Sequence, residues 1–156
     1  MSSIYIFSPS GAVRDRKAFS KGISILKSLG HDVHIDPSAL SSSERFAGDD
    51  ATRLLAIDRA CDSACDVAMI SRGGYGLTRL LPKMNYSKIK KAIRKGTKFI
   101  GFSDFTAFQL SVLSQTQEIT WSGPSVMDDL AVEAPDDITL GCLEDVLSSQ
   151  VEGAGW

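Results

Sequence analysis

The stretch Lys98-Phe99-Ile100-Gly101-Phe102-Ser103-Asp104-Phe105-Thr106-Ala107 decides the fold, because it joins a buried strand to a helix through one short turn. Residues 98–100 form a short apolar run typical of a buried strand, and residues 106–113 space apolar side chains three and four apart, as a helix does. A sharp strand-to-helix turn lifts its apex side chain away from the sheet and points the first helical N–H groups at whatever binds there. Ser103 occupies that apex, and Gly101 relieves crowding inside the turn. The pattern indicates a nucleophile elbow, although Phe105 stands where G-x-S-x-G has its second glycine, so a turn with an incidental serine also fits.

Short apolar segments alternate with helical patterns along the rest of the chain. We expect strands over residues 4–7, 33–35, 67–70 and 99–101, and helices over residues 18–29, 51–61, 89–93, 107–113 and 136–147. Gly30 is placed to end the first helix, and Asp49 or Asp50 to begin the second. This alternation predicts an α/β fold with a mainly parallel sheet in three layers, flavodoxin-like or glutamine-amidotransferase-like.

Composition and charge narrow the class of protein. The 156 residues, 43% hydrophobic and 23% charged, match a globular domain, and the net charge is -2. The one basic run, residues 88–95, places lysines around isoleucines at helical spacing, which is typical of a solvated helix face. No stretch approaches the roughly 18 apolar residues of a membrane span, and the N-terminus lacks a secretory signal. We therefore expect a cytoplasmic protein without nucleic-acid or membrane partners.

Three cysteines, an odd number, suit a reducing compartment better than a disulfide framework. Cys61 and Cys65 lie four residues apart on an expected helix, where packing is the ordinary explanation and a metal or redox role the alternative.

Loops that follow the strands gather at one edge of a parallel sheet, where ligands bind. They are residues 8–11, residues 71–76 and the turn at Ser103. The glycines of residues 72–76 expose backbone N–H groups that can approach an anion or a developing oxyanion. Their spacing matches neither phosphate-binding nor dinucleotide-binding motifs, and a flexible turn without a ligand is the alternative.

A serine nucleophile needs an adjacent base, usually histidine. The two histidines, His31 and His34, flank the second expected strand, and we interpret each as structural or surface. Asp104 directly follows the serine, so it is better placed to give its backbone N–H to an oxyanion than to orient a base. The residues thus predict a nucleophile and oxyanion donors without a base.

Several segments together resemble the LD-carboxypeptidases, which include muramoyl-tetrapeptide carboxypeptidases and microcin C self-immunity peptidases. The similar segments are Ser8-Pro9-Ser10-Gly11, Phe46-Ala47-Gly48-Asp49-Asp50 with Arg53, Ser71-Arg72-Gly73-Gly74-Tyr75-Gly76 with Arg79-Leu80-Leu81-Pro82, Gly101-Phe102-Ser103-Asp104 with Thr106-Ala107, and Gly123-Pro124. They span about residues 4 to 130, in the family's order.

The resemblance implies a catalytic role for Ser103 as the nucleophile of a Ser-His-Glu triad. It also implies an oxyanion hole from the N–H groups of Gly73 or Gly74 and of Asp104. Substrate-binding roles are expected for Arg72, Tyr75 and Ser10. The implied substrate is cytosolic murein tetrapeptide, which loses its terminal D-alanine during wall recycling, and no metal or cofactor is implied.

Two departures from the family leave alternatives open. Ser122 stands before Gly123-Pro124, where the family usually has histidine, and no histidine follows Ser103. We therefore expect residues 1–135 to form an N-terminal nucleophile-bearing domain and residues 136–156 a helix and the start of a linker to a missing catalytic domain, with little activity alone. A homodimer is also open.

Two other functions remain: a self-immunity-type peptidase acting on peptidyl-nucleotides or acyl-sulfamoyl adenylates, and a non-catalytic α/β module that binds a small anion.

Overall fold

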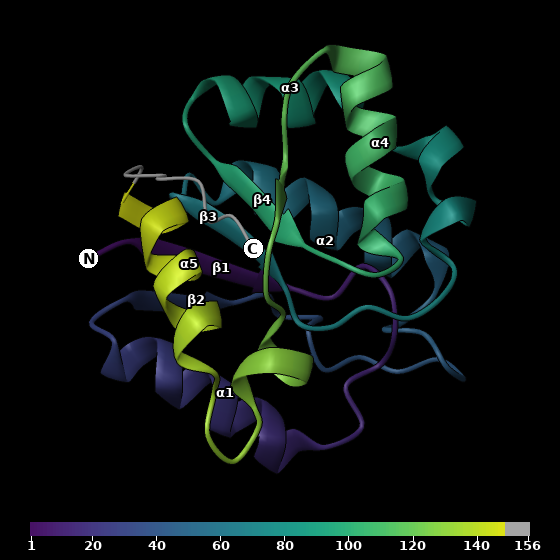
Figure 1. The fold of residues 1–156 in the computed structure, drawn as a ribbon. Helices are drawn as coiled ribbons and strands as arrows, with labels where there is room; N and C mark the ends of the chain where they lie inside the picture. Colours follow the sequence, from purple (N-terminus) through teal and green to yellow (C-terminus); the bar gives the residue numbers. More distant parts are fainter. Residues whose placement is uncertain (149–156) are drawn as a thin grey trace.

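Five parallel strands form one sheet in the order β2-β1-β3-β4-β5 in this computed structural model, which describes residues 1–148 (Figure 1). The strands are β1 (Ser3–Phe7), β2 (Asp32–Ile35), β3 (Val67–Ile70), β4 (Lys98–Gly101) and β5 (Trp121–Ser122). β1 lies between β2 and β3, with Ile4 opposite Val33 on one side and Val67 on the other. The expected α/β fold with a parallel sheet is confirmed.

Helices cover both faces of the sheet and complete three layers (Figure 1). The helices are α1 (Arg16–Ser28), α2 (Asp50–Asp62), α3 (Tyr86–Arg94), α4 (Phe105–Thr116) and α5 (Asp137–Ser148). Shorter turns are η1 (Leu77–Arg79), η2 (Leu81–Lys83) and the π-helical turn η3 (Val126–Leu130). One core joins the sheet to α2, α3 and α4, and a second joins it to α1, η3 and α5.

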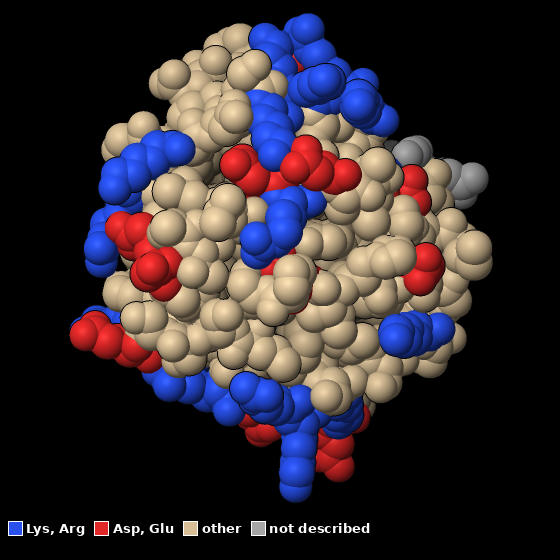
Figure 2. Space-filling view, turned by 180° about the vertical axis from the view of Figure 1, so that it is seen from behind, with Lys and Arg blue, Asp and Glu red and all other residues tan. Residues whose placement is uncertain are grey.

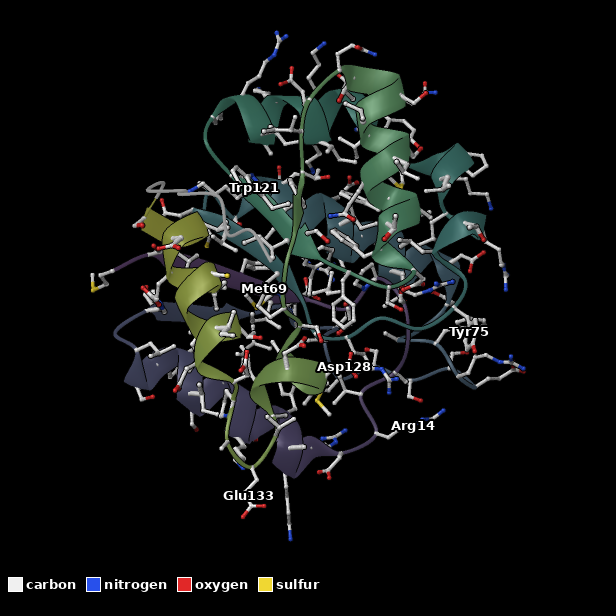
Figure 3. All side chains as sticks on the ribbon, viewed as in Figure 1. Arg14, Met69, Tyr75, Trp121, Asp128 and Glu133 are labelled. Atoms are coloured by element: carbon white, nitrogen blue, oxygen red, sulfur yellow. The ribbon has the colours of Figure 1, made fainter. Side chains whose placement is uncertain are left out.

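The central strand β3 shows why both faces need a cover. All four of its residues are buried, and successive side chains enter opposite cores. Ala68 and Ile70 face α2–α4, while Val67 and Met69 face the other layer, and Figure 3 shows Met69 in the interior. A strand buried on both faces reads as a continuous apolar run.

Side-chain and glycine caps set the helix boundaries. Asp49 is the N-cap of α2 and its carboxylate accepts the N–H of Thr52, which decides between the two expected starting residues. Gly30 follows α1 with φ +88°, and its N–H donates to the carbonyl of Lys27.

Three features differ from the sequence expectations or extend them. The edge strand β5 was not expected, because two residues carry no periodic signal. Cys65 is not on the helix with Cys61: α2 ends at Asp62, and Cys65 is buried between α2 and β3. Helix α5 forms close to the expected range and buries Leu143 and Leu147, while the expected linker over residues 149–156 lies outside the described residues.

Charge is distributed unevenly over the surface. Figure 2 shows Lys and Arg side chains at the upper edge of one face, where α3 lies, with acidic side chains beneath them. Lys88 of α3 pairs with Asp62 of α2 at 2.6 Å, as expected for a solvated helix face. Helix α4 carries no charged residue. None of the helices within residues 1–148 has the length and apolar character that crossing a membrane requires.

Candidate active site

The turn between β4 and α4 holds Ser103 in an unusual backbone conformation. Ser103 has φ +62°, a left-handed value that non-glycine residues seldom adopt, and its side chain is exposed. Gly101 allows the turn, because an added Cβ would lie 2.7 Å from Phe105 Cδ1 and 2.8 Å from Ile70 Cδ1. Phe105 can then pack beneath the turn, fully buried. The exposed serine is thus held at the apex of a strained strand-to-helix turn.

The glycine loop after β3 lies directly against this serine. A Cβ added at Gly73 would stand 2.8 Å from Ser103 Cβ and 3.0 Å from Ser103 Oγ. A Cβ at Gly74 would stand 2.9 Å from both the Cα and the N of Gly11, in the loop after β1. The three loops therefore meet at one edge of the sheet, and two of the contacts require glycine.

The carboxylate of Asp104 ties the three loops together. Its Oδ2 accepts the hydroxyl of Ser10 at 2.7 Å, and its Oδ1 accepts the N–H of Gly74 at 3.0 Å. Hydrogen bonds to an ionised carboxylate are stronger than neutral ones. This role in holding the loops was not predicted from the sequence, because there the Asp104 side chain was weighed only as a group that could orient a base.

The same contacts distinguish the two candidate glycine amides. The peptide unit between Gly73 and Gly74 is held at both ends: its N–H donates to Asp104, and its carbonyl accepts Arg72 Nε at 3.1 Å. The Gly74 N–H is thereby engaged within the protein. Gly73 is the glycine of this pair that lies against Ser103. The Asp104 N–H stands at the start of α4, where helical N–H groups favour negative charge.

The three residues expected to bind substrate differ in accessibility. Ser10 is 1% exposed and its hydroxyl is engaged by Asp104, an arrangement that suits a positioning role. Arg72 is half-buried and folded over its own loop. Tyr75 is 72% exposed, and Figure 3 shows it at the periphery, at the same end of the molecule as Arg14. Tyr75 has the most accessible side chain of the three.

The histidines lie away from Ser103. His31 precedes β2 at the amino end of the sheet, whereas Ser103 follows β4 at the carboxyl end. Its Nδ1 accepts the N–H of Ser2, so its Nε2–H donates to Glu144 of α5 at 2.7 Å. His34 is exposed and pairs with Asp32. Both contacts agree with the structural or surface interpretation.

Ser122 lies next to the site. It is exposed in β5 and pairs in register with Gly101, two residues before Ser103. Beside it a cavity of about 330 Å³ is lined by Phe102, Ser122, Gly123, Pro124, Asp129, Ile138, Thr139 and Cys142. Within residues 1–148, the His, Cys, Asp and Glu side chains form no group of three or more that could hold a metal.

Comparisons with known proteins show which family the chain is similar to. Residues 4–123 match the LD-carboxypeptidase N-terminal domain of peptidase family S66. The chain belongs to the LD-carboxypeptidase family. A Streptomyces coelicolor protein named "Putative carboxypeptidase" is 31% identical to this LD-carboxypeptidase family member over 126 residues, which cover 78% of the chain and 39% of that protein.

Solved structures show the same fold. Muramoyltetrapeptide carboxypeptidase from Oxalobacter formigenes matches with a TM-score of 0.79 and 31% identity, over 92% of this chain and 47% of that one. The microcin C7 self-immunity protein MccF, in complex with aspartyl sulfamoyl adenosine, matches with a TM-score of 0.85 and 23% identity, over 93% and 44%. The chain thus spans less than half the length of each of these three proteins.

Proposed function

We propose that this chain is the nucleophile-bearing half of a serine LD-carboxypeptidase, with Ser103 as the nucleophile. The observation that carries the proposal is the exposed Ser103 hydroxyl, held at φ +62° against Gly73. In this mechanism Ser103 Oγ attacks the scissile carbonyl, and the N–H groups of Gly73 and Asp104 hold the tetrahedral oxyanion. The acyl-enzyme forms as the amine of the terminal residue leaves, and water then releases the shortened peptide.

Within residues 1–148 both histidines lie away from Ser103, so the proton transfers require groups from elsewhere. We assign them to a histidine and a glutamate in a second, C-terminal domain, which the greater length of the relatives can accommodate. Loss of one triad member costs on the order of a million-fold in turnover, so the chain alone should be nearly inactive.

The proposed substrate is murein tetrapeptide, from which the enzyme would release terminal D-alanine in the cytoplasm during wall recycling. The 31% identity to the muramoyltetrapeptide carboxypeptidase supports this choice over the acyl-sulfamoyl adenylates of the self-immunity branch, where identity is 23%. Within the glycine loop, the exposed Tyr75 and the half-buried Arg72 are the candidate contacts for the peptide and its carboxylate.

The test compares the 156-residue chain with a fusion of residues 1–148 to the second half of the Oxalobacter formigenes enzyme. D-alanine release from murein tetrapeptide is measured for both, each with and without Ser103→Ala. We expect activity only in the fusion that retains Ser103. Ser103-dependent release by the chain alone would overturn the need for a second domain, and a folded fusion inactive on both murein tetrapeptide and aspartyl sulfamoyl adenosine would overturn the assignment.

A further inference from the structure

Arg53 of α2 is the largest fully buried side chain among the described residues, with 0% exposure. It lies one turn into the helix, 50 residues before Ser103 in the sequence. Burying a guanidinium is costly unless its charge and its donors are matched by partners. The contacts of Arg53 therefore show what this buried charge holds in place.

Three groups surround the guanidinium. Its Nη2 donates to Asp50 Oδ1 at 2.6 Å, and its Nη1 donates to the carbonyl of Pro9 at 3.2 Å. The ring of Phe46 lies against it, with the Arg53 Cζ 4.8 Å from the ring centroid. Within residues 1–148 its Nε has no hydrogen-bond partner. The donors of the guanidinium are therefore only partly satisfied, and its position is fixed by packing against Phe46 and by the two Nη hydrogen bonds.

These contacts reach both loops that Asp104 holds from the other side. Pro9 immediately precedes Ser10, whose hydroxyl donates to Asp104. The Arg53 Nη1 also lies 3.3 Å from where a Cβ of Gly76 would stand, and Phe46 Cε1 lies 2.6 Å from that point. Gly76 has φ +89° and is the last residue of the glycine loop, which lies between β3 and η1. Arg53 and Phe46 thus fill the space under the glycine loop.

We propose that Arg53 is a positioning residue that braces the loop after β1 and the glycine loop after β3, and so holds Gly73 and Gly74 at their places beside Ser103 and Asp104. The proposal rests on the proposed function, because it assigns the positions of the oxyanion donors to this buried side chain. Displacement by about 1 Å in such a site can cost about a hundredfold in rate.

The Gly74 amide offers a direct readout that needs no catalytic activity. In the 156-residue chain labelled with ¹⁵N-glycine, only 13 glycines contribute signals. Asp104→Ala gives the position of the Gly74 resonance when its bond to the carboxylate is lost. We expect Arg53→Met to move that resonance by at least about half of the same shift, and to speed exchange of the Gly74 amide proton about tenfold, as loss of one hydrogen bond implies. Gly30 and Gly96, which have open space around them, should not move.

Arg59→Met is the matched control. Arg59 lies on the same helix, and it bonds Asp36 at 2.7 Å and Ser38 rather than a residue of the glycine loop. Both variants should lower the midpoint of urea unfolding, but only Arg53→Met should shift Gly74. Arg53→Lys keeps the charge and can reach one of the two oxygen partners, so it should show a smaller shift in a folded protein.

A Gly74 resonance unmoved in Arg53→Lys and Arg53→Met, with stability reduced as in Arg59→Met, would overturn the proposal. If Arg53→Met fails to fold, Arg53→Lys decides the question, since an unmoved Gly74 in that variant contradicts the bracing role. Failure of the proposed function is distinguished because it appears as an inactive fusion whose Gly74 amide still responds to Arg53.

Discussion

Two aspartates lie at the same edge of the sheet, Asp36 after β2 and Asp104 after β4. Their surroundings differ in burial and in charge. The side chain of Asp36 is fully buried and meets Arg59 through two hydrogen bonds, together with the hydroxyls of Tyr5 and Ser38. Asp104 is half-buried, and within residues 1–148 its carboxylate accepts hydrogen bonds from two neutral donors, the hydroxyl of Ser10 and the N–H of Gly74.

The difference separates a structural tie from a site arranged for chemistry. Burial opposes ionisation of Asp36, but the hydrogen bonds from Arg59, Ser38 and Tyr5 outweigh it and hold the pKa of that carboxyl below its usual value. In this saturated cluster both oxygens of the Asp36 carboxylate accept hydrogen bonds. At Asp104 the same kind of carboxylate gathers three loops around the exposed hydroxyl of Ser103.

The largest expected effect comes from removing the saturated carboxylate. Asp36→Ala should lower the free energy of unfolding by about 4 kcal/mol, because it leaves Arg59 and the hydroxyl of Tyr5 without their partner. Asp104→Ala should lower the free energy of unfolding by about 2 kcal/mol, since the Ser10 hydroxyl and the Gly74 N–H lose their half-buried acceptor. Urea unfolding of the two variants measures both values. A greater loss for Asp104→Ala than for Asp36→Ala would break the comparison.

A second prediction concerns the close approach of the glycine loop to Ser103. Gly73→Ala places a Cβ within 3.0 Å of Ser103 Cβ and Oγ, so the loop or the turn must shift. Overpacking of this kind costs about 2 kcal/mol. Urea unfolding measures the loss, and the Gly74 resonance of labelled protein reports the displaced loop.

The control for this substitution is Gly141→Ala in α5, where an added Cβ meets nothing within 4 Å. Removing a glycine from a helix interior should raise stability by about 0.5–1 kcal/mol. Equal effects of the two alanines would mean that the spacing between the glycine loop and Ser103 is not tight.

Most of the fold was predictable because its signals are local. Apolar runs such as residues 67–70 and the capping residues Asp49 and Gly30 act through their own neighbours in the sequence. The edge strand β5 escaped prediction because its two residues become a strand only by pairing with Ile100 and Gly101. Cys65 was misplaced because α2 ends at Asp62, three residues before it.

The candidate site was predictable in its loops but not in its internal bonds. The spacing around Ser103 and the glycine run showed which loops follow the strands, and a parallel sheet brings such loops to one edge. The partners of Asp104 lie 30 and 94 residues away, and Arg53 lies 44 residues from Pro9. Contacts at such separations depend on the packing of whole elements, which no local pattern in one sequence encodes.

The smallest expected effect tests the saturated cluster through alkaline pH. Burial and the hydrogen bond to Asp36 raise the pKa of Tyr5 to about 12, whereas an unfolded tyrosine ionises near about 10. The folded protein therefore holds the phenolic proton more tightly, so this contribution to stability is complete below about pH 10 and is lost as pH rises toward about 12. Tyr5→Phe should cost on the order of 1 kcal/mol at neutral pH through the lost hydrogen bond.

The same variant should show a shallower alkaline loss of stability than the parent chain. Burial also raises the pKa of the Cys61 thiol to about 12. A free thiol ionises at about 8.5, so the stability that Cys61 contributes begins to fall at a lower pH than the stability that Tyr5 contributes. Urea midpoints measured from about pH 8 to about pH 11 in the parent, Tyr5→Phe and Cys61→Ala separate the two groups, since the cysteine acts first as pH rises. An alkaline decline identical in the parent and in Tyr5→Phe would show that the phenol does not belong to the saturated cluster, and the contrast between Asp36 and Asp104 would then rest on Arg59 and Ser38 alone.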